Sequence, residues 1–202
     1  MLLDCDFLFP SLIKVEYFCI QVYMYSKIKQ NKVLFFLLKA LLLYVLWYML
    51  YELWIGPKGV LDDWVINNLV HLSSFVLEVL GYRLMPEPML AENIRTVGID
   101  GTHGLWIGDP CNGLSLFALF IGFVLAYPGP IKKKAWFIPL GVLTIHLLNV
   151  IRIVLLTIIV KIAPDYLAFN HTYTFTFLVY SYVFILWMLW ANKLSISKES
   201  EK

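Results

Sequence analysis

Three residues of the chain are able to carry out covalent chemistry together: Cys111, Arg152 and His171. A cysteine thiolate attacks a carbonyl carbon and forms a thioester, and a histidine transfers protons near neutral pH. An arginine keeps its charge at pH 7, so it stabilises a thiolate or an oxyanion rather than acting as a base. If the fold brings the three side chains together, the chemistry they favour is acyl transfer through a thiol.

Cys111 lies in the stretch 109–114, where a polar, glycine-rich segment becomes apolar. We expect Asp109 to be the N-cap and Pro110 the first residue of a helix, which places Cys111 in the first helical turn. Free backbone N–H groups and the helix dipole favour a thiolate there, whereas the carboxylate of Asp109 opposes it. The alternative is that Cys111 is an inert packing residue at a helix end.

The composition is that of an integral membrane protein with a single domain. Hydrophobic residues make up 60% of the 202 residues and charged residues 15%, with a mean hydropathy of +0.75, whereas soluble domains are about half apolar and a quarter charged. Three cysteines do not make a disulfide framework. The charged loops are too short to bind nucleic acid, and no glycine-rich phosphate loop is present. The partner expected of such an apolar chain is membrane lipid. His71 and His103 could join His171 in a metal site, but their spacings match no zinc pattern, so we expect no metal and no cofactor.

Four apolar segments are predicted to cross the membrane, because each is close to the ~20 residues that span the bilayer core. They are Val33–Ile55, Pro110–Tyr127, Trp136–Val160 and Tyr173–Trp190. The membrane-embedded domain is thus residues 33–191, with a cytoplasmic or interfacial segment over 1–32 and a cytoplasmic tail over 192–202. Residues 1–26 could instead be an upstream extension of the reading frame, with Met24 as the true start.

The lysines predict the orientation of these spans. Residues 26–32, 128–135 and 191–202 each carry three lysines and no arginine, and segments of this kind stay in the cytoplasm. Both termini are therefore expected in the cytoplasm, with Cys111 and His171 on the outer side. Arg152 lies eight residues before the outer end of its span, roughly 12 Å along the helix axis, where an arginine is costly and faces the bundle interior.

Two smaller elements are predicted between the first and second spans. Residues 61–80 carry apolar side chains at helical spacing with polar ones opposite, which predicts an amphipathic helix at the outer membrane surface. The apolar positions are Leu61, Val65, Leu69, Leu72, Val76 and Leu80. Further on, Ile94–Ile99, the turn signal Asp100-Gly101 and Leu105–Ile107 predict a small extracytoplasmic hairpin, with a plain loop as the alternative.

The third span carries a polar stripe. Asn149 and Arg152 are three residues apart and share one helix face, and His146 continues the stripe inward. We interpret His146 as a hydrogen-bonded residue of the bundle rather than a ligand. The face that carries Asn149 and Arg152 is the one expected to meet Cys111.

Three motifs in this order resemble the exosortase/archaeosortase family. They are Pro110-Cys111-Asn112-Gly113-Leu114, then Asn149-Val150-Ile151-Arg152-Ile153, then His171 shortly before the last span. The resemblance covers about residues 33–191. It is strongest to the short exosortase F-type proteins of Gram-negative bacteria, which have Cys-Asn-Gly where many relatives have Cys-Ser-Gly.

The resemblance implies an all-α bundle of about four transmembrane helices with a Cys-Arg-His active site, which carries over as Cys111, Arg152 and His171. The residues expected to support this site are Asn149, Asn112 and Asp109. The implied activity is that of a cysteine protease or transpeptidase in the bacterial inner membrane, with its site facing the periplasm. Its implied partners are exported proteins that end in a sorting signal, which consists of a short motif, a hydrophobic helix and a basic end.

In this hypothesis Cys111 attacks the scissile carbonyl, Arg152 stabilises the oxyanion, and His171 protonates the leaving amine. The alternative from another class is a non-catalytic membrane protein that is a partner in an export or exopolysaccharide system. In such a protein Cys111→Ser would be silent, whereas Arg152→Leu would harm folding. A transporter is disfavoured, because four spans with one buried arginine and no internal repeat make a poor carrier.

Overall fold

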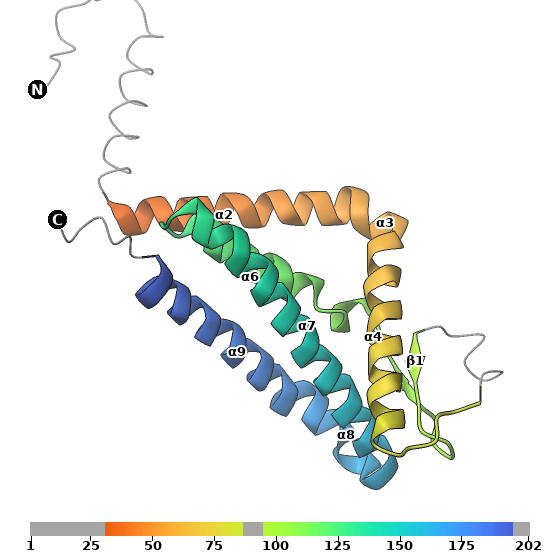
Figure 1. Cartoon of the computed structure of the whole chain (residues 1–202). Coiled ribbons are helices and arrows are strands. Elements are labelled where there is room, and N and C mark those ends of the chain that lie inside the picture. Colours follow the sequence, from red (N-terminus) through yellow and green to blue (C-terminus); the bar gives the residue numbers. More distant parts are fainter. Residues whose placement is uncertain (1–30, 87–94, 196–202) are drawn as a thin grey trace, which may run out of the picture.

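The computed structural model describes residues 31–86 and 95–195, and within these ranges the protein is a helical bundle with a smaller layer across one end. The bundle helices are α2 (Lys32–Leu50), α6 (Leu114–Ala126), α7 (Ile131–Ile162) and α9 (Phe175–Leu189). They run alternately between two ends of the molecule (Figure 1). One end carries Lys132–Lys134 and Lys193 and is called here the basic end; the other carries Cys111 and is called the Cys111 end.

Three helical segments are long and apolar enough to cross a membrane: Val33–Lys58, Ile131–Ile162 and Pro164–Leu194. They confirm helices at the first, third and fourth predicted spans. The second is shorter than predicted, because α6 has 13 residues and extends about 20 Å against a bilayer core of about 30 Å. The helix begins at Leu114 rather than Pro110, since the left-handed backbone of Gly113 separates it from the residues before it.

The first span stays helical for longer than its sequence suggests. After α2 the chain continues as a π-helical turn, η2 (Tyr51–Ile55), and a short helix, α3 (Gly56–Lys58). The helix thus ends within residues 56–59, a stretch whose two glycines and one proline favour a break. Proline fixes a φ that suits a helix, and the chain turns only at Gly59, whose φ of +64° favours a residue without Cβ.

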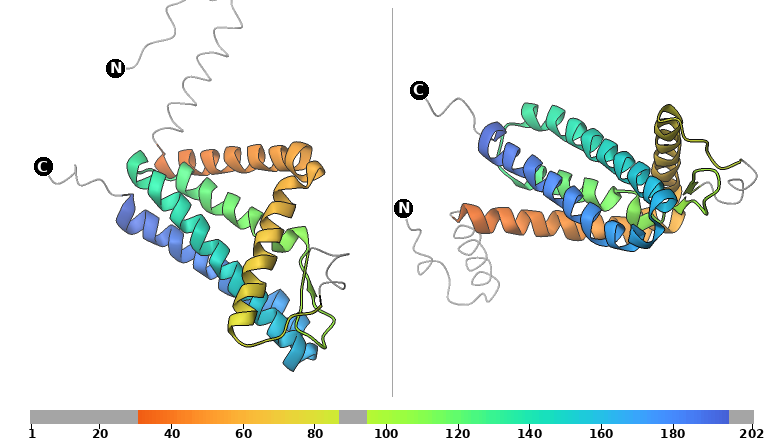
Figure 2. Two further views of the ribbon diagram at one scale, coloured as in Figure 1. Left: turned by 45° about the vertical axis from the view of Figure 1, so that its right-hand side comes forward. Right: turned by 90° about the horizontal axis from the view of Figure 1, so that it is seen from below.

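The amphipathic helix α4 (Val60–Val79) leaves α3 at a sharp corner and lies across the Cys111 end of the bundle (Figures 1 and 2). Its buried face is rotated from the predicted one, because α4 packs against both α7 and the hairpin. The buried residues are Asp62, Val65, Ile66, Leu69, Ser73 and Leu77. Leu80, which was predicted to be buried, is 57% exposed.

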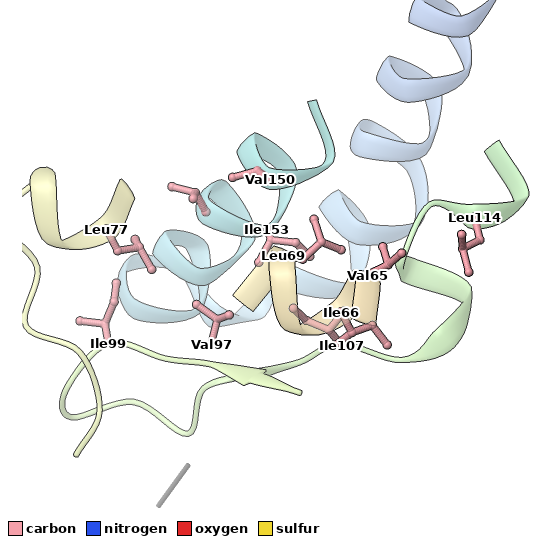
Figure 3. Packing of buried hydrophobic residues seen from close by; sticks show 11 residues of the cluster. Val65, Ile66, Leu69, Leu77, Val97, Ile99, Ile107, Leu114, Val150 and Ile153 are labelled. Carbon is pink, nitrogen blue, oxygen red and sulfur yellow. The ribbon is translucent and has the colours of Figure 1, made fainter. Parts of the chain in front are cut away.

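One hydrophobic core joins α4, the hairpin and α7. Figure 3 shows Leu69 and Leu77 of α4 directed toward Val97 and Ile99 of the hairpin and toward Ile153 of α7. Each of these side chains is at most 2% exposed. This core therefore fixes the C-terminal half of α7, which carries Arg152, against the layer that carries Cys111.

The predicted hairpin is present, with shorter strands than expected. Strands β1 (Thr96–Val97) and β2 (Leu105–Trp106) pair antiparallel, with Thr96 opposite Trp106. Ile99 forms a further antiparallel bridge to Leu84. Residues 98–104 connect the strands, which is a longer connection than the two-residue turn that the sequence suggested. The start of the predicted first strand lies outside the described residues.

A second hydrophobic core lies between α6, α7 and α9. Its buried residues are Leu116, Phe120, Val124, Phe137, Ile145, Val179, Val183, Leu186 and Trp190. The two helices α6 and α7 meet closely at Gly141, where an added Cβ would lie 2.1 Å from the ring of Phe120. This contact sets the spacing between the helix that begins after Cys111 and the helix that carries Arg152.

Lysines hold the helix ends together at the basic end. Lys134 Nζ donates to the carbonyls of Leu125 and Tyr127 at the end of α6, and Lys133 Nζ donates to the carbonyl of Leu194 in the π-helical turn η6 (Trp190–Leu194). Terminal helix carbonyls lack intrahelical partners, so cations are favourable there. Two of the three lysine-rich segments thus lie together, as the predicted orientation requires. The predictions for residues 1–30 and for most of the C-terminal tail lie outside the described residues.

Candidate active site

Cys111 is the last residue of a short 3₁₀ turn, η3 (Asp109–Cys111), which lies just before α6. The prediction that Asp109 caps a helix containing Cys111 is wrong in detail. Gly113 has a φ of +89°, and an added Cβ would also lie 3.3 Å from the side chain of Asn149. A glycine is needed at this position, so Cys111 belongs to the turn before the helix and not to its first turn.

The capping role expected of Asp109 belongs instead to Asn112. The side-chain oxygen of Asn112 accepts a hydrogen bond from the backbone N–H of Leu114, at 2.8 Å. Its amide nitrogen donates to a carboxylate oxygen of Asp62 at 2.6 Å, and the hydroxyl of Tyr51 donates to the same oxygen at 2.8 Å. Asn112 and Asp62 are each 2% exposed, so the turn is fixed by a buried polar network that reaches α4 and η2.

Asn149 fixes Cys111 from the opposite side. Its side-chain nitrogen donates to the backbone carbonyl of Cys111 at 2.9 Å, and the residue is fully buried. Its side-chain oxygen has no hydrogen-bond partner among the described residues. The structure thus gives Asn149 a positioning contact with the turn of Cys111.

His171 lies within a helix and not in the loop predicted to precede the last span. A 3₁₀ turn, η4 (Pro164–Tyr166), a short helix, α8 (Leu167–Phe169), and a π-helical turn, η5 (Asn170–Thr174), lead without interruption into α9. Pro164 starts this segment, since proline suits the first helical turn. The π turn carries His171, and such turns are frequent at functional sites.

The three reactive side chains meet at the imidazole of His171. Its Nε2 lies 3.4 Å from Sγ of Cys111 and 3.3 Å from a terminal guanidinium nitrogen of Arg152. Arginine nitrogens only donate hydrogen bonds, so Nε2 is the acceptor and the imidazole proton belongs on Nδ1. Nε2 is then also the atom that accepts the proton of Cys111. The structure therefore brings together the three residues that the sequence singled out.

Arg152 lies deep along its helix. It is ten residues before the end of α7, about 15 Å along the axis. Its Nε is buried and has no hydrogen-bond partner within residues 31–86 and 95–195. No carboxylate there forms an ion pair with it: both ion pairs in the described part of the chain belong to Arg95. The positive charge of Arg152 is thus directed at the cysteine and histidine without a competing anion.

Asp109 takes part in an ion-pair cluster on the outside of the site. Arg95 donates to Asp109 at 2.5 Å and to Asp63 of α4 at 2.6 Å. These hydrogen bonds, first that to Asp63 and then that to Asp109, raise the pKa of the Arg95 guanidinium above its ordinary value. Both carboxylates are more than half exposed, and exposed pairs of this kind contribute at most about 1 kcal/mol. The cluster joins α4, the hairpin and the turn of Cys111.

Sequence reasoning missed Asp62 and Tyr51. The helical spacing of Asp62 could have indicated its burial, because it lies three, four and seven residues before Val65, Ile66 and Leu69 and therefore on the buried face of α4.

The expected role of His146 as a hydrogen-bonded residue of the bundle is confirmed, since its Nε2 lies 2.8 Å from the side-chain oxygen of Asn68 on α4. Across the described ranges, no three His, Cys, Asp or Glu side chains gather as a metal site.

The sequence matches the family model described as Transmembrane exosortase (Exosortase_EpsH) over residues 15–192 of the 202. The chain belongs to the transmembrane exosortase family. The match includes all three residues that meet at the site. No curated protein and no solved structure matches the chain.

Proposed function

We propose that this transmembrane exosortase is a cysteine transpeptidase that removes the C-terminal sorting signals of exported proteins through a thioester on Cys111. The observation that carries the proposal is the contact of one imidazole nitrogen with both Cys111 Sγ and Arg152. A thiol, a proton acceptor and a fixed cation within hydrogen-bond reach are the groups that acyl transfer needs. Membership of the transmembrane exosortase family supports the same activity.

The first half-reaction forms the thioester. His171 Nε2 takes the proton of Cys111, and the thiolate attacks the scissile carbonyl carbon to give a tetrahedral oxyanion. The oxyanion collapses with cleavage of the C–N bond, and the leaving amine takes the proton from Nε2. The products of this step are the acylated Cys111 and the free sorting-signal peptide.

The second half-reaction releases the exported protein. An acceptor nucleophile gives its proton to His171 Nε2 and attacks the thioester carbonyl. The C–S bond then breaks, and the thiolate of Cys111 recovers its proton from His171. The acceptor is a second substrate, and the same imidazole nitrogen serves as base and as acid in turn.

The contact between Arg152 and His171 gives the arginine two successive partners. In the free protein a guanidinium N–H donates to Nε2 at 3.3 Å. Once Nε2 carries a proton it no longer accepts, so this N–H becomes available to the oxyanion that forms in the same step. Arg152 therefore changes its hydrogen-bond partner as negative charge develops, which is stabilisation in the transition state rather than in the ground state.

The proposed location is the bacterial inner membrane, with four spans, both termini in the cytoplasm and the site facing the periplasm. The lysines at the basic end support this orientation. Within the family, the Cys-Asn-Gly sequence at 111–113 supports a place among the short F-type proteins of Gram-negative bacteria.

The proposal is tested by comparing the C-termini of exported proteins in cells that carry wild-type protein or Cys111→Ala at equal abundance. C-terminal peptides are identified by mass spectrometry. We expect a set of exported proteins to lack their hydrophobic C-terminal helix in wild-type cells and to retain it in the variant. Cys19→Ala makes the same side-chain change at a cysteine that belongs to none of the three motifs of the site, and it should process as wild type.

Unchanged C-termini in Cys111→Ala cells would overturn the proposal and favour a non-catalytic role. A loss of processing in both cysteine variants would also contradict it, because it would remove the specificity for Cys111. Protein levels in the membrane, measured in the same cells, separate loss of chemistry from loss of folding.

A further inference from the structure

A groove of about 490 Å³ lies in the bundle between α2 and α9, with α6 as its floor. Tyr44 and Trp47 form the α2 wall, and Tyr180 and Trp187 form the α9 wall. The residues of α2 and η2 that line the groove extend from Ala40 to Glu52, which is about 18 Å along the helix. A groove of this length accommodates about three turns of a further helix.

Three of the six residues of α6 that line the groove are small. Ser115, Ala118 and Gly122 line it at spacings of three and four residues, so they share one face of α6. An added Cβ on Gly122 would meet nothing within 4 Å. Glycine within a helix is less favourable than alanine by about 0.5–1 kcal/mol, and no contact of Gly122 within the described chain accounts for it. In membranes, small residues at this spacing let another helix approach closely.

The groove is closed at the basic end and leads toward the active site. The ring of Phe123 stacks on Trp187 with 4.5 Å between centroids and makes an edge contact with Phe36 at 5.5 Å. These rings join α2, α6 and α9 and close that end. At the other end the floor begins at Ser115, four residues after Cys111.

The surroundings of the groove restrict what it can bind. Its walls belong to helices that are apolar enough to lie in the bilayer, where a polypeptide must satisfy its own backbone hydrogen bonds and is therefore helical. A partner that fills the groove and also presents a peptide bond to Cys111 is a single apolar helix with a polar segment at its outer end. A lipid acyl chain would fill the groove but presents no peptide bond.

We propose that the groove between α2, α6 and α9 is the docking site for the transmembrane helix of the substrate, and that Gly122 allows its close approach. This inference rests on the proposed function, because it assigns the occupant as a substrate. The docked helix lies along the small residues of α6, and its outer end is level with the turn that carries Cys111. Recognition of the helix is thus separate from the chemistry.

The test uses the full chain with Cys111→Ala, so that binding is measured without turnover. The photo-crosslinking amino acid p-benzoylphenylalanine replaces Tyr180 in the groove, or Leu147, which is 46% exposed on α7 outside the groove. The probe is a biotinylated synthetic Leu/Ala helix of about 20 residues with a lysine-rich C-terminus, reconstituted with the protein in vesicles of phosphatidylethanolamine and phosphatidylglycerol.

We expect about tenfold more crosslinked peptide from position 180 than from position 147, a ratio that corresponds to about 1.4 kcal/mol. Gly122→Leu should remove this excess, because the leucine side chain projects into the groove from a position where an added Cβ meets nothing within 4 Å. Ala135→Leu, which adds bulk at an exposed position near the basic end of α7, should leave it unchanged.

Equal crosslinking from the two positions, or crosslinks from position 180 to lipid alone, would overturn the docking site. An excess that persists in Gly122→Leu would overturn the role of Gly122. These outcomes are independent of the proposed chemistry. If Cys111→Ala cells stop processing while position 180 gives no excess of crosslinks, the transpeptidase proposal stands and the groove assignment fails. If Cys111→Ala cells still process while position 180 gives the excess, the transpeptidase proposal fails and the groove remains a helix-binding site.

Discussion

At the scale of single residues, the site depends on one nitrogen atom that serves two neighbours. His171 Nε2 is within reach of both Cys111 Sγ and Arg152, at 3.4 and 3.3 Å. The distance to Arg152 is long for a hydrogen bond between an N–H donor and its acceptor, as is common before substrate closes an active site. The unprotonated Nε2 has one lone pair, which either accepts from Arg152 or takes the proton of Cys111, so protonation by Cys111 releases Arg152 from this nitrogen. The proposed transfer of Arg152 from His171 to the oxyanion follows from this competition for the lone pair of Nε2.

Arg152 variants test whether the arginine acts in the transition state. Removing one donor to an oxyanion costs about 10²–10³ in kcat, so we expect a loss of this size in Arg152→Gln. Arg152→Lys keeps the charge but not the planar fork of donors and should lose less. In both variants kcat and kcat/KM should fall by the same factor, as they do when an interaction is made only in the transition state. Rates of signal removal in proteoliposomes measure this.

An effect on KM alone would contradict this role for Arg152. Thermal unfolding of each purified variant provides the control for folding, because a buried arginine that only joined helices would change stability in proportion to activity. Full activity in Arg152→Gln would remove the arginine from the mechanism altogether.

Residue identities could be predicted from the sequence, but several of their contacts could not. The chemistry of Cys111, Arg152 and His171 follows from residue type and from their position at one end of the spans. The hydrogen-bond partners of the polar residues around the site could not be predicted in the same way. Asp109 was expected to cap the helix, but its carboxylate binds Arg95, and Asn112 accepts the helix N–H instead. Both side chains have capping chemistry, and only the backbone conformation of Gly113 decides between them.

At the scale of elements, apolar periodicity predicted which segments are helices better than where they begin and end. Hydropathy identifies a long apolar segment but carries no information on π-helical or 3₁₀ turns. The turns η2, η3 and η5 are the places where the boundaries differ, and they supply Tyr51, Cys111 and His171 to the site. The face of α4 was misjudged for a related reason, since two neighbours cover it and the sequence does not place the second one.

Alanine substitutions at two glycines, Gly113 and Gly122, should change the stability of the protein in opposite directions. Gly113→Ala places a Cβ on a left-handed residue, which costs about 1–2 kcal/mol, and the Cβ would lie 3.3 Å from Asn149. Gly122→Ala meets nothing within 4 Å and should gain about 0.5–1 kcal/mol within the helix. We therefore expect the melting temperature in detergent to fall for the first variant and to rise slightly for the second.

Processing should follow the same division. Gly113→Ala moves the turn that carries Cys111 and should lower kcat for signal removal. Gly122→Ala leaves that turn unchanged and should retain kcat, whereas the methyl group that it adds to the groove should raise KM for the substrate. A Gly113→Ala protein that is as stable and as active as wild type would show that the turn does not require its left-handed residue.

At the scale of the whole molecule, charge is distributed unequally between the two ends. Every acidic residue in the described ranges lies at or near the Cys111 end. Lys132, Lys133, Lys134 and Lys193 lie at the basic end, where Lys133 and Lys134 bind terminal carbonyls. This distribution is what the positive-inside rule relates to a cytoplasmic basic end. The orientation stays a prediction of the sequence, which rests on counts of lysines and not on packing.

Single-cysteine labelling tests the orientation. In a protein with all native cysteines changed to serine, Asp165→Cys reports the Cys111 end and Lys193→Cys the basic end; both positions are exposed. A membrane-impermeant maleimide added to intact spheroplasts should label position 165, and should label position 193 only after permeabilisation. The reverse pattern would place the active site in the cytoplasm and contradict access from the periplasm.

The most direct test of the central claim is to trap the acyl-enzyme. Wild-type protein is mixed in proteoliposomes with an exported protein identified by its Cys111-dependent C-terminus, turnover is stopped with acid, and the peptide that contains Cys111 is weighed by mass spectrometry. We predict a mass increase equal to the substrate fragment that ends at the cleavage site. This adduct should be lost in hydroxylamine, which cleaves thioesters. Processed substrate with Cys111 unmodified at every time, together with wild-type turnover by Cys111→Ala, would contradict the account.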